Sequence, residues 1–331
     1  MKNNIFVNNY EPILDLVETQ KAIKLIKNNF EVNLAEALGL TRVSAPLFVD
    51  PNTGLNDNLT GKEKAVGFNL ISGKYLEIVQ SLAKWKRYAL KKYNLSGLYT
   101  DMNAIRPNEE IDNLHSLYVD QWDWEKVISK EERNLDYLKS TVRKIYQAFL
   151  KTEAYISNIY PLLKHDLPED ITFITTDELL KMYPDSSNKE RENAICRKYG
   201  AVFIIGIGKT LANGKIHDDR AADYDDWDYN GDILVYHKTL DIGLEISSMG
   251  IRVNKDSLLR QLKIKNEEFK LEYDYHKQII NDELPLTVGG GIGQSRLCLF
   301  FLSKAHLGEV QASYWDKEDI EEFMKYNIHL L

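Results

Sequence analysis

The chain has few cysteines and no long apolar run. Cys196 and Cys298 are the only cysteines among 331 residues, so neither a disulfide framework nor a zinc cluster is indicated. No apolar stretch of about 18 residues could span a membrane, and the N-terminus lacks the apolar core of a signal peptide. These absences predict a cytoplasmic protein that is not bound to a membrane.

The chain also lacks an excess of positive charge and any linker. Lys and Arg number 42 against 50 Asp and Glu, for a net charge of -8, which argues against a nucleic-acid binder, although a local basic patch could bind a small anion. No Pro/Gly/Ser-rich tract or repeat divides the sequence, and 44% hydrophobic content can supply a core. We therefore expect a single domain over residues 1–331.

Periodicity predicts interleaved helices and strands. Helical spacing runs from Ile23 to Leu38 and stops at Gly39. The other expected helices are 81–92, 125–150 and 177–199, the last broken at Pro184. Strands are expected at 41–49 (with Pro46 at an edge or bulge), 65–69, 76–79, 98–106, 114–124, 201–208, 231–236 and 243–248. Without a regular βαβ rhythm, this pattern favours an α+β fold with a mainly antiparallel sheet flanked by helices.

A glycine-rich stretch near the C-terminus, Val288 to Leu297, has four glycines in five positions and leads into an apolar helix. Glycines let the backbone approach a ligand, and a helix N-terminus favours anions. Arg296 stands in the first turn, where the macrodipole disfavours a cation by about 0.3–1 kcal/mol. Its position therefore indicates a bound anion that both the helix N-terminus and Arg296 contact. The stretch matches neither a P-loop nor a dinucleotide fingerprint. A helix-entry turn with glycines for tight packing is the alternative.

The expected strand around residues 116–125 mixes polar and apolar side chains on both faces. A period of two places Val119, Gln121 and Asp123 on one face, opposite a face made of Tyr118, Asp120, Trp122 and Trp124. The first face is therefore either exposed to solvent or lines a polar pocket.

Arg106 closes the partner strand just before Pro107. It is either a surface arginine or a residue that grips a phosphate together with Arg296, because guanidinium groups match phosphate oxygens. Lys84 and Lys86 on the basic helix project differently, so a solvated face cannot explain both.

An acidic run over residues 217–232 partly matches an EF-hand loop. His237 stands where a bidentate Glu is required, and a strand follows, so we exclude calcium. Glu245 and Ser247, alternating on one face of strand 243–248, could instead hold Mg²⁺ against phosphates together with Asp232. Other acids could bind a ligand ammonium. Nucleotide and amino acid are thus the expected ligands, and no Ser/His/Asp or Cys/His order supports a covalent nucleophile.

Three features resemble the signature motifs of class II aminoacyl-tRNA synthetases: the helix and strand with Pro46, the hairpin closed by Arg106, and the glycine-rich element ending in Arg296. Further blocks resemble the aspartate-ammonia ligase family, the ammonia-dependent asparagine synthetases, in that family's order. They are 57–61, 81–87, 114–125, 223–227, 230–234, 247–253 and 289–296.

The resemblance implies a class II synthetase-like catalytic fold and a homodimer built on the N-terminal helix and the Pro46 strand. It implies that L-aspartate reacts with ATP and Mg²⁺ to give β-aspartyl-AMP, which ammonia converts to asparagine. It assigns phosphate contacts to Arg106 and Arg296. The substrate aspartate and ammonia would be bound by Asp57, Asp225, Asp123, Lys86, Gln121, Ser81 and Ser248, and the nucleotide and metal by Ser116, Asp232, Glu245, Ser247, Arg252, Gly291 and Gly293, with Glu245 and Asp232 on the metal.

Two departures from the family pattern stand out: the segment between Trp227 and Asn230 is shorter, and the N-terminus is several residues longer. A tRNA-charging synthetase is an alternative, but it needs an anticodon-reading domain, often a β-barrel, for which this chain has neither length nor charge. A non-catalytic sensor is a second alternative, against which the retention of Arg106, Arg296 and Glu245 argues.

Overall fold

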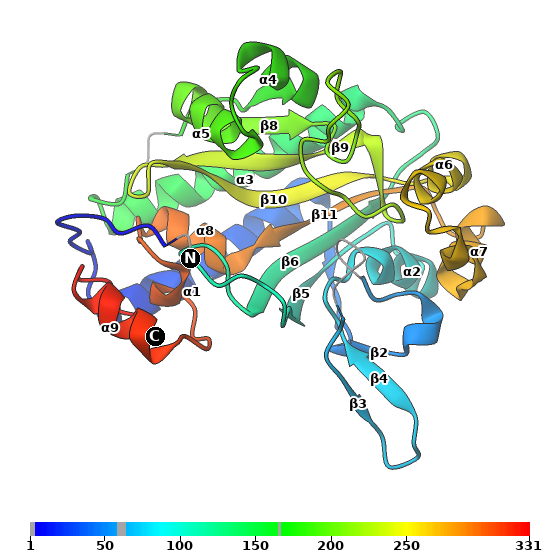
Figure 1. Cartoon of the computed structure of the whole chain (residues 1–331), viewed down its shortest axis with the longest axis horizontal. Coiled ribbons are helices and arrows are strands. Elements are labelled where there is room, and N and C mark those ends of the chain that lie inside the picture. Colours follow the sequence, from blue (N-terminus) through cyan, green and yellow to red (C-terminus); the bar gives the residue numbers. More distant parts are fainter. Residues whose placement is uncertain (1–3, 58–63, 165–166) are drawn as a thin grey trace.

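A computed structural model describes residues 4–57, 64–164 and 167–331. Its centre is an eight-stranded sheet (Figure 1). Neighbouring strands are antiparallel except for the parallel pairs at the two edges, β1 with β5 and β7 with β8, which confirms the expected mainly antiparallel sheet. The strands, in spatial order, are β1 (Thr41–Arg42), β5 (Gly97–Ile105), β6 (Tyr118–Val127), β11 (Thr287–Gly293), β10 (Ile242–Arg252), β9 (Asp225–His237), β8 (Ala201–Ile205) and β7 (Thr172–Thr175).

Three helices cover one face of this sheet: α1 (Leu16–Leu38), α3 (Leu135–Ile159) and α8 (Gln294–Phe301). Their apolar sides meet the sheet in the main core, where Phe30 of α1 packs against Trp122 of β6 and Phe149 of α3. Helix α1 ends at Gly39, as expected, because the glycine adopts a left-handed conformation with φ of 68°.

The opposite face carries helices at its two ends and leaves the middle of the sheet for a pocket. At one end, α4 (Thr176–Met182) and α5 (Asn188–Tyr199) form a small core with β8 and β9, and these two helices are the region predicted to break at Pro184. At the other end lie α2 (Ala83–Tyr93), α6 (Lys255–Lys265), η2 (Glu268–Glu272) and α7 (Asp274–Ile280).

A second, three-stranded sheet forms an arm that projects from the body (Figure 1). Its strands are β2 (Phe48–Val49), β4 (Tyr75–Ile78) and β3 (Gly67–Asn69), and the 3-10 turn η1 (Pro51–Thr53) follows β2. The single strand expected over residues 41–49 is therefore wrong: its two ends pair in different sheets, with Pro46 in the irregular segment between them.

The helix expected over residues 125–150 is also wrong in its bounds. Residues 125–127 continue β6, and α3 begins only after Asn134, whose side chain accepts a hydrogen bond from the Tyr137 N–H. Similarly, the strand expected from residue 114 begins at Tyr118. The C-terminal η3 (Leu307–Glu309) and α9 (Lys317–Met324) were not anticipated from the sequence.

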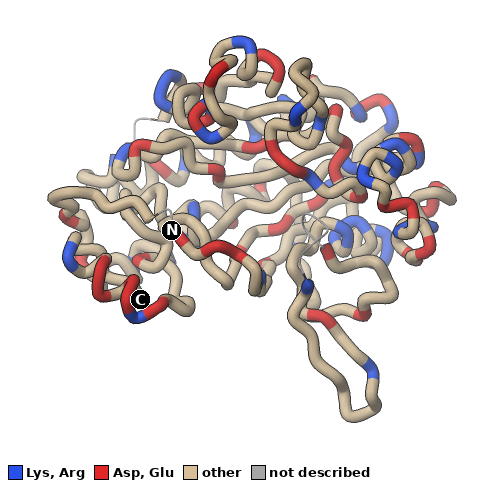
Figure 2. The backbone as a smooth tube through the Cα atoms, viewed as in Figure 1, with Lys and Arg blue, Asp and Glu red and all other residues tan. Residues whose placement is uncertain are grey.

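Charge is mixed along the chain. Figure 2 shows Lys and Arg interspersed with Asp and Glu on the helices at both ends of the molecule. Among the helices in the described ranges, none combines the length and the apolar character needed to cross a membrane.

Candidate active site

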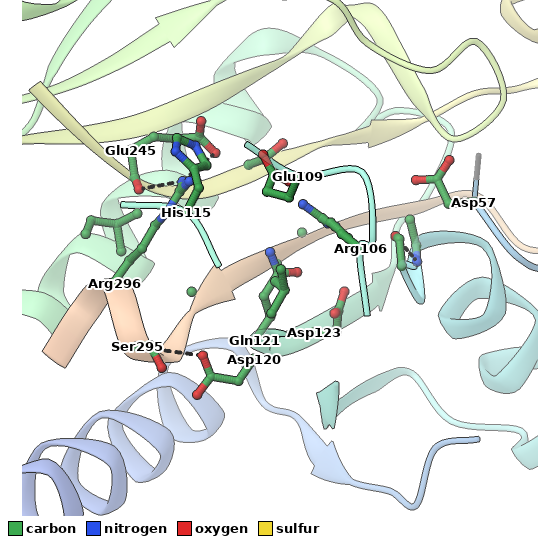
Figure 3. Close-up of a pocket in the computed structure, with 18 of the residues that line it drawn as sticks. Asp57, Arg106, Glu109, His115, Asp120, Gln121, Asp123, Glu245, Ser295 and Arg296 are labelled. Atoms are coloured by element: carbon green, nitrogen blue, oxygen red, sulfur yellow. Dashed lines mark hydrogen bonds and ion pairs between the residues drawn. The ribbon is translucent and has the colours of Figure 1, made fainter. Parts of the chain in front are cut away.

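The pocket lies over the middle of the large sheet, where β6, β11, β10 and β9 run side by side. Asp123 on β6 is opposite Gly291, Gly291 is opposite Ser248, and Ser248 is opposite Asp232. Directly opposed residues point to the same face of an antiparallel sheet. Of these residues, Asp123, Gly291 and Ser248 line a cavity of about 440 Å³, which is drawn in Figure 3.

Fourteen of the sixteen site residues proposed from the sequence line this cavity, so the sheet brings together residues that are far apart in the chain. They are Asp57, Ser81, Lys86, Arg106, Ser116, Gln121, Asp123, Asp225, Glu245, Ser248, Arg252, Gly291, Gly293 and Arg296. The face carrying Gln121 and Asp123 therefore lines a polar pocket, which was one of the two alternatives. The individual role of each residue stays a prediction.

Ser247 is one of the two that do not line the cavity. A register shift between Glu245 and Ser247 interrupts the pairing of β10 with β9, so the two residues do not share a face as expected. The shift turns Ser248 toward the pocket and leaves Ser247 buried, with no hydrogen-bond partner for its hydroxyl among the described residues. A period of two cannot foresee such an irregularity.

Asp232 is the second proposed residue that does not line the cavity, and its carboxylate is bonded to Arg220. Arg220 Nη2 donates to Asp232 Oδ1 at 2.6 Å, and Arg220 also bonds the hydroxyl of Ser248. Arg220 itself lines the cavity, and the sequence reasoning missed it although it stands out as an arginine inside an acidic run. Asp232 thus holds Arg220 at the wall of the pocket.

Arg106 and Arg296 both enter the cavity, from different elements (Figure 3). The guanidinium group of Arg106 contacts the Gln80 carbonyl oxygen through Nε and Nη2, at 3.4 and 3.3 Å. Arg296 Nη1 donates to the Glu245 carbonyl oxygen at 3.2 Å and lies 3.8 Å from the Glu245 carboxylate. Long contacts of this kind leave guanidinium donors with capacity for phosphate oxygens.

The deep wall of the cavity is a buried ion-pair network. Lys86 is bonded to the Asp123 carboxylate and donates to the Gly290 carbonyl oxygen at 2.7 Å. Burial lowers the pKa of Lys86, although the charge of Asp123 opposes this. The second oxygen of Asp123 is buried and has no hydrogen-bond partner within the described residues, so it can accept a hydrogen bond from a ligand ammonium.

Arg252 holds the other two carboxylates of this wall. It bonds Asp225 and donates to both oxygens of Glu125 at 2.8 to 3.1 Å. Burial would lower the pKa of Arg252, but Glu125 and Asp225 outweigh it and raise that pKa. Asp225 is therefore fixed beside the pocket by the cation.

The glycines form β11 itself, not a loop, and they make room for side chains of β6. A Cβ on Gly289 would lie 1.8 Å from Glu125 Oε2 and 2.7 Å from Arg252 Nη2, and one on Gly291 would lie 2.4 Å from Gln121 Oε1. The Glu125 side chain thus crosses β11 above Gly289 to reach Arg252 on β10. This is a packing reason for glycine that the sequence reasoning did not find.

Three more of the proposed residues line the cavity from segments outside the strands of the large sheet. Ser81 accepts a hydrogen bond from the Ala83 N–H at the start of α2. Ser116 lies before β6, where its hydroxyl contacts the Tyr118 carbonyl oxygen at 3.1 Å. Asp57 lines the cavity, but the rest of its block, 58–61, lies outside the described residues. Besides Arg220, the lining residues that the sequence reasoning missed include Glu109, His115, Asp218, Tyr224, Ser295 and Gln311.

Acidic groups gather near Glu245. Burial raises the pKa of Asp218, and nearby Glu245 adds to this. Burial, with smaller contributions from Glu245 and Asp218, raises the pKa of Asp232 to about 7 against the opposing charge of Arg220. A divalent cation would relieve this repulsion. No group of three His, Cys, Asp or Glu in the described part of the chain is placed to hold a metal ion. However, Mg²⁺ commonly uses only one or two carboxylates together with substrate phosphates. Glu245 and Asp218 fit that requirement.

Comparisons with known proteins agree on one family. The family model described as aspartate-ammonia ligase matches residues 17–327. The aspartate-ammonia ligase of Clostridium perfringens strain SM101 is 56% identical over 336 residues, covering 100% of both chains. That of Fusobacterium nucleatum is 57% identical and covers 97% of this chain and 99% of its own.

Among solved structures, the asparaginyl-tRNA synthetase of Pyrococcus horikoshii in complex with asparaginyl-adenylate superposes with a TM-score of 0.67 at 17% identity, over 89% of this chain and 68% of that one. The Entamoeba histolytica asparaginyl-tRNA synthetase with asparaginyl-adenylate gives 0.66 at 16% identity, over 91% and 68%. At these identities the likeness shows the fold, and it confirms the class II synthetase fold expected from the motifs.

Proposed function

The chain belongs to the aspartate-ammonia ligase family, and we propose that it drives the synthesis of L-asparagine from L-aspartate and ammonia with ATP, through a β-aspartyl-AMP intermediate. In the first step, an oxygen of the aspartate side-chain carboxylate attacks the α-phosphorus of ATP, and the bond to the pyrophosphate oxygen breaks. In the second, ammonia attacks the acyl carbon and the bond to AMP breaks. AMP and pyrophosphate are the by-products.

The observation that carries this proposal is that carboxylates and two arginines with spare donors line one pocket. Figure 3 shows Asp57 and Asp123 on one side and Arg296 with Glu245 on the other, with Arg106 between them. Asp57 and Asp123 suit an ammonium group, and the arginines suit phosphates. An amino acid and ATP would therefore meet near Arg106.

Arg106 and Arg296 would stabilise the negative charge that develops on the phosphates as pyrophosphate leaves. The open oxygen of Asp123 would bind the aspartate ammonium, with Asp57 and Gln121 beside it. Asp225, which Arg252 holds beside the pocket, would accept a proton from ammonium or from the attacking nitrogen. Ser81 and Ser248 would orient the substrate, and Ser116, Gly291 and Gly293 would contact the nucleotide.

Mg²⁺ would be held by Glu245, with Asp218 in place of the originally proposed Asp232, whose carboxylate is bonded to Arg220. Bound there, the ion would neutralise phosphate charge. We also propose a cytoplasmic homodimer of single-domain subunits, built on α1 and residues 41–49. Leu16, Val17 and Val32 of α1 and Leu47 and Phe48 expose apolar side chains that a second subunit could cover.

Aspartate labelled with ¹⁸O in its side-chain carboxylate tests the route. Incubated with ATP, Mg²⁺ and ammonium, the protein should form asparagine, AMP and pyrophosphate in equal amounts, with one ¹⁸O in the AMP phosphate. Formation of ADP and phosphate, or unlabelled AMP, would contradict the acyl-adenylate route. AMP formation that requires tRNA would indicate a synthetase instead.

A further inference from the structure

Asp120 occupies a position that the proposed chemistry does not explain. It lies on β6 beside Gln121 and, like Gln121, lines the pocket, but its carboxylate is bonded to residues of α1, α8 and the segment at Gln311, and the residue is only 6% exposed. A buried carboxylate is costly unless it is hydrogen-bonded or paired. Its partners therefore indicate what it does.

Asp120 joins four parts of the chain. Its Oδ2 accepts from Lys27 Nζ of α1 at 2.9 Å, and its Oδ1 accepts from the Ser295 N–H of α8 at 3.1 Å (Figure 3) and from Gln311 Nε2 at 3.2 Å. Gln311 also donates to the Ser295 hydroxyl at 3.0 Å. Burial would lower the pKa of Lys27, but the charge of Asp120, the nearby Cys298 and the hydrogen bond to Asp120 together outweigh it and raise that pKa.

The contact with Ser295 falls at a helix start that lacks a cap of its own. The residue before α8 is Gly293, which has no side chain to accept a hydrogen bond from the first turn. Asp120 supplies that acceptor from the neighbouring strand, and its negative charge suits a helix N-terminus. The next residue after Ser295 is Arg296, which enters the pocket.

We propose that Asp120 is a positioning residue, which fixes the first turn of α8 and thereby directs the guanidinium group of Arg296 toward the phosphates of ATP. Lys27 and Gln311 keep the carboxylate in place. The inference rests on the proposed function, in which Arg296 binds ATP. It predicts that loss of Asp120 affects the use of ATP and not that of aspartate.

The test is the steady-state kinetics of the full-length protein, in the assay for AMP and pyrophosphate, with each substrate varied in turn. Asp120→Ala should raise the KM for ATP about fivefold or more, as expected for loss of a hydrogen bond to a charged group, and should change the KM for aspartate less than about twofold. Asp120→Asn keeps an oxygen that can accept from Ser295 and should recover most of the ATP affinity.

Glu309→Ala is the matched control. Glu309 is a buried carboxylate that accepts from the backbone N–H groups of Ala305 and His306 and lies 3.7 Å from Lys304, but it does not line the pocket. It should lower thermal stability and leave the ratio of the two KM values unchanged.

The outcomes are distinct. A wild-type protein that makes no AMP removes the proposed function, and the inference with it. An active wild type whose Asp120→Ala variant keeps its KM for ATP, or shows equal increases for both substrates, overturns the inference alone. So does an Asp120→Asn variant no better than Asp120→Ala in its ATP affinity.

Discussion

The packing of Glu125 over Gly289 leads to a prediction that separates two glycines of one motif. In Gly289→Ala, the new Cβ would lie 1.8 Å from Glu125 Oε2, so the carboxylate must move away from Arg252. The Thr287 hydroxyl also donates to Glu125, at 2.6 Å, but it is neutral and cannot replace the charge of Arg252. Overpacking costs about 1–3 kcal/mol, and breaking a buried ion pair costs about 3–5 kcal/mol. We expect the free energy of unfolding to fall by about 3 kcal/mol, between these limits.

Gly293→Ala is the matched comparison. Its Cβ would meet the Arg296 side chain at 3.3 Å or more, and its φ of -65° suits alanine, so we expect a loss below about 1 kcal/mol. Urea unfolding followed by circular dichroism measures both. The reasoning about Gly289 is refuted if the two variants lose similar stability, or if Gly289→Ala remains within about 1 kcal/mol of the wild type.

Three further predictions concern the site and pH. Arg296→Ala should abolish adenylate formation, measured as aspartate-dependent exchange of pyrophosphate into ATP, while the circular dichroism spectrum stays unchanged; an undiminished exchange rate would contradict its role. Asp123→Asn should raise the KM for aspartate at least about tenfold, because the buried oxygen facing the ligand loses its charge, and an unchanged KM would count against this. Burial lowers the pKa of His306 from 6.5 to about 4, so the stability contributed by its neutral form is present above pH 6.5 and is lost as pH falls to 4. The loss should reach about 3 kcal/mol, and a His306→Gln variant whose stability falls as steeply as that of the wild type over this range would refute it.

Much of the site could be predicted from the sequence because its residues occur in short blocks with a period that the strands keep. Gln121 and Asp123 alternate on β6, and their register with β11 then places them beside the glycines. The bounds of elements were harder to predict. The run after Glu125 has helical spacing, yet residues 125–127 stay in β6, where Glu125 forms its buried pair with Arg252. Tertiary pairing there outweighs local propensity.

Features that depend on register or on contacts across the sheet could not be predicted in the same way. Because of the register shift before Ser247, Ser248 lines the pocket and Ser247 does not. The spacing of residues along the sequence does not predict this shift. Arg220 was overlooked because its partner Asp232 lies 12 residues away in sequence, on β9.

The amino-acid sequence by itself determined the family, the mainly antiparallel α+β fold and fourteen of the residues that line the pocket, since motifs and alternation are local properties. The tertiary structure decided which neighbouring residues face the pocket and which carboxylates are already paired. It also supplied a different reason for the glycines. They leave space for the side chains of Glu125 and Gln121 to lie across β11. Glu125 on β6 can reach Arg252 on β10 only over β11, where any side chain larger than glycine would block it.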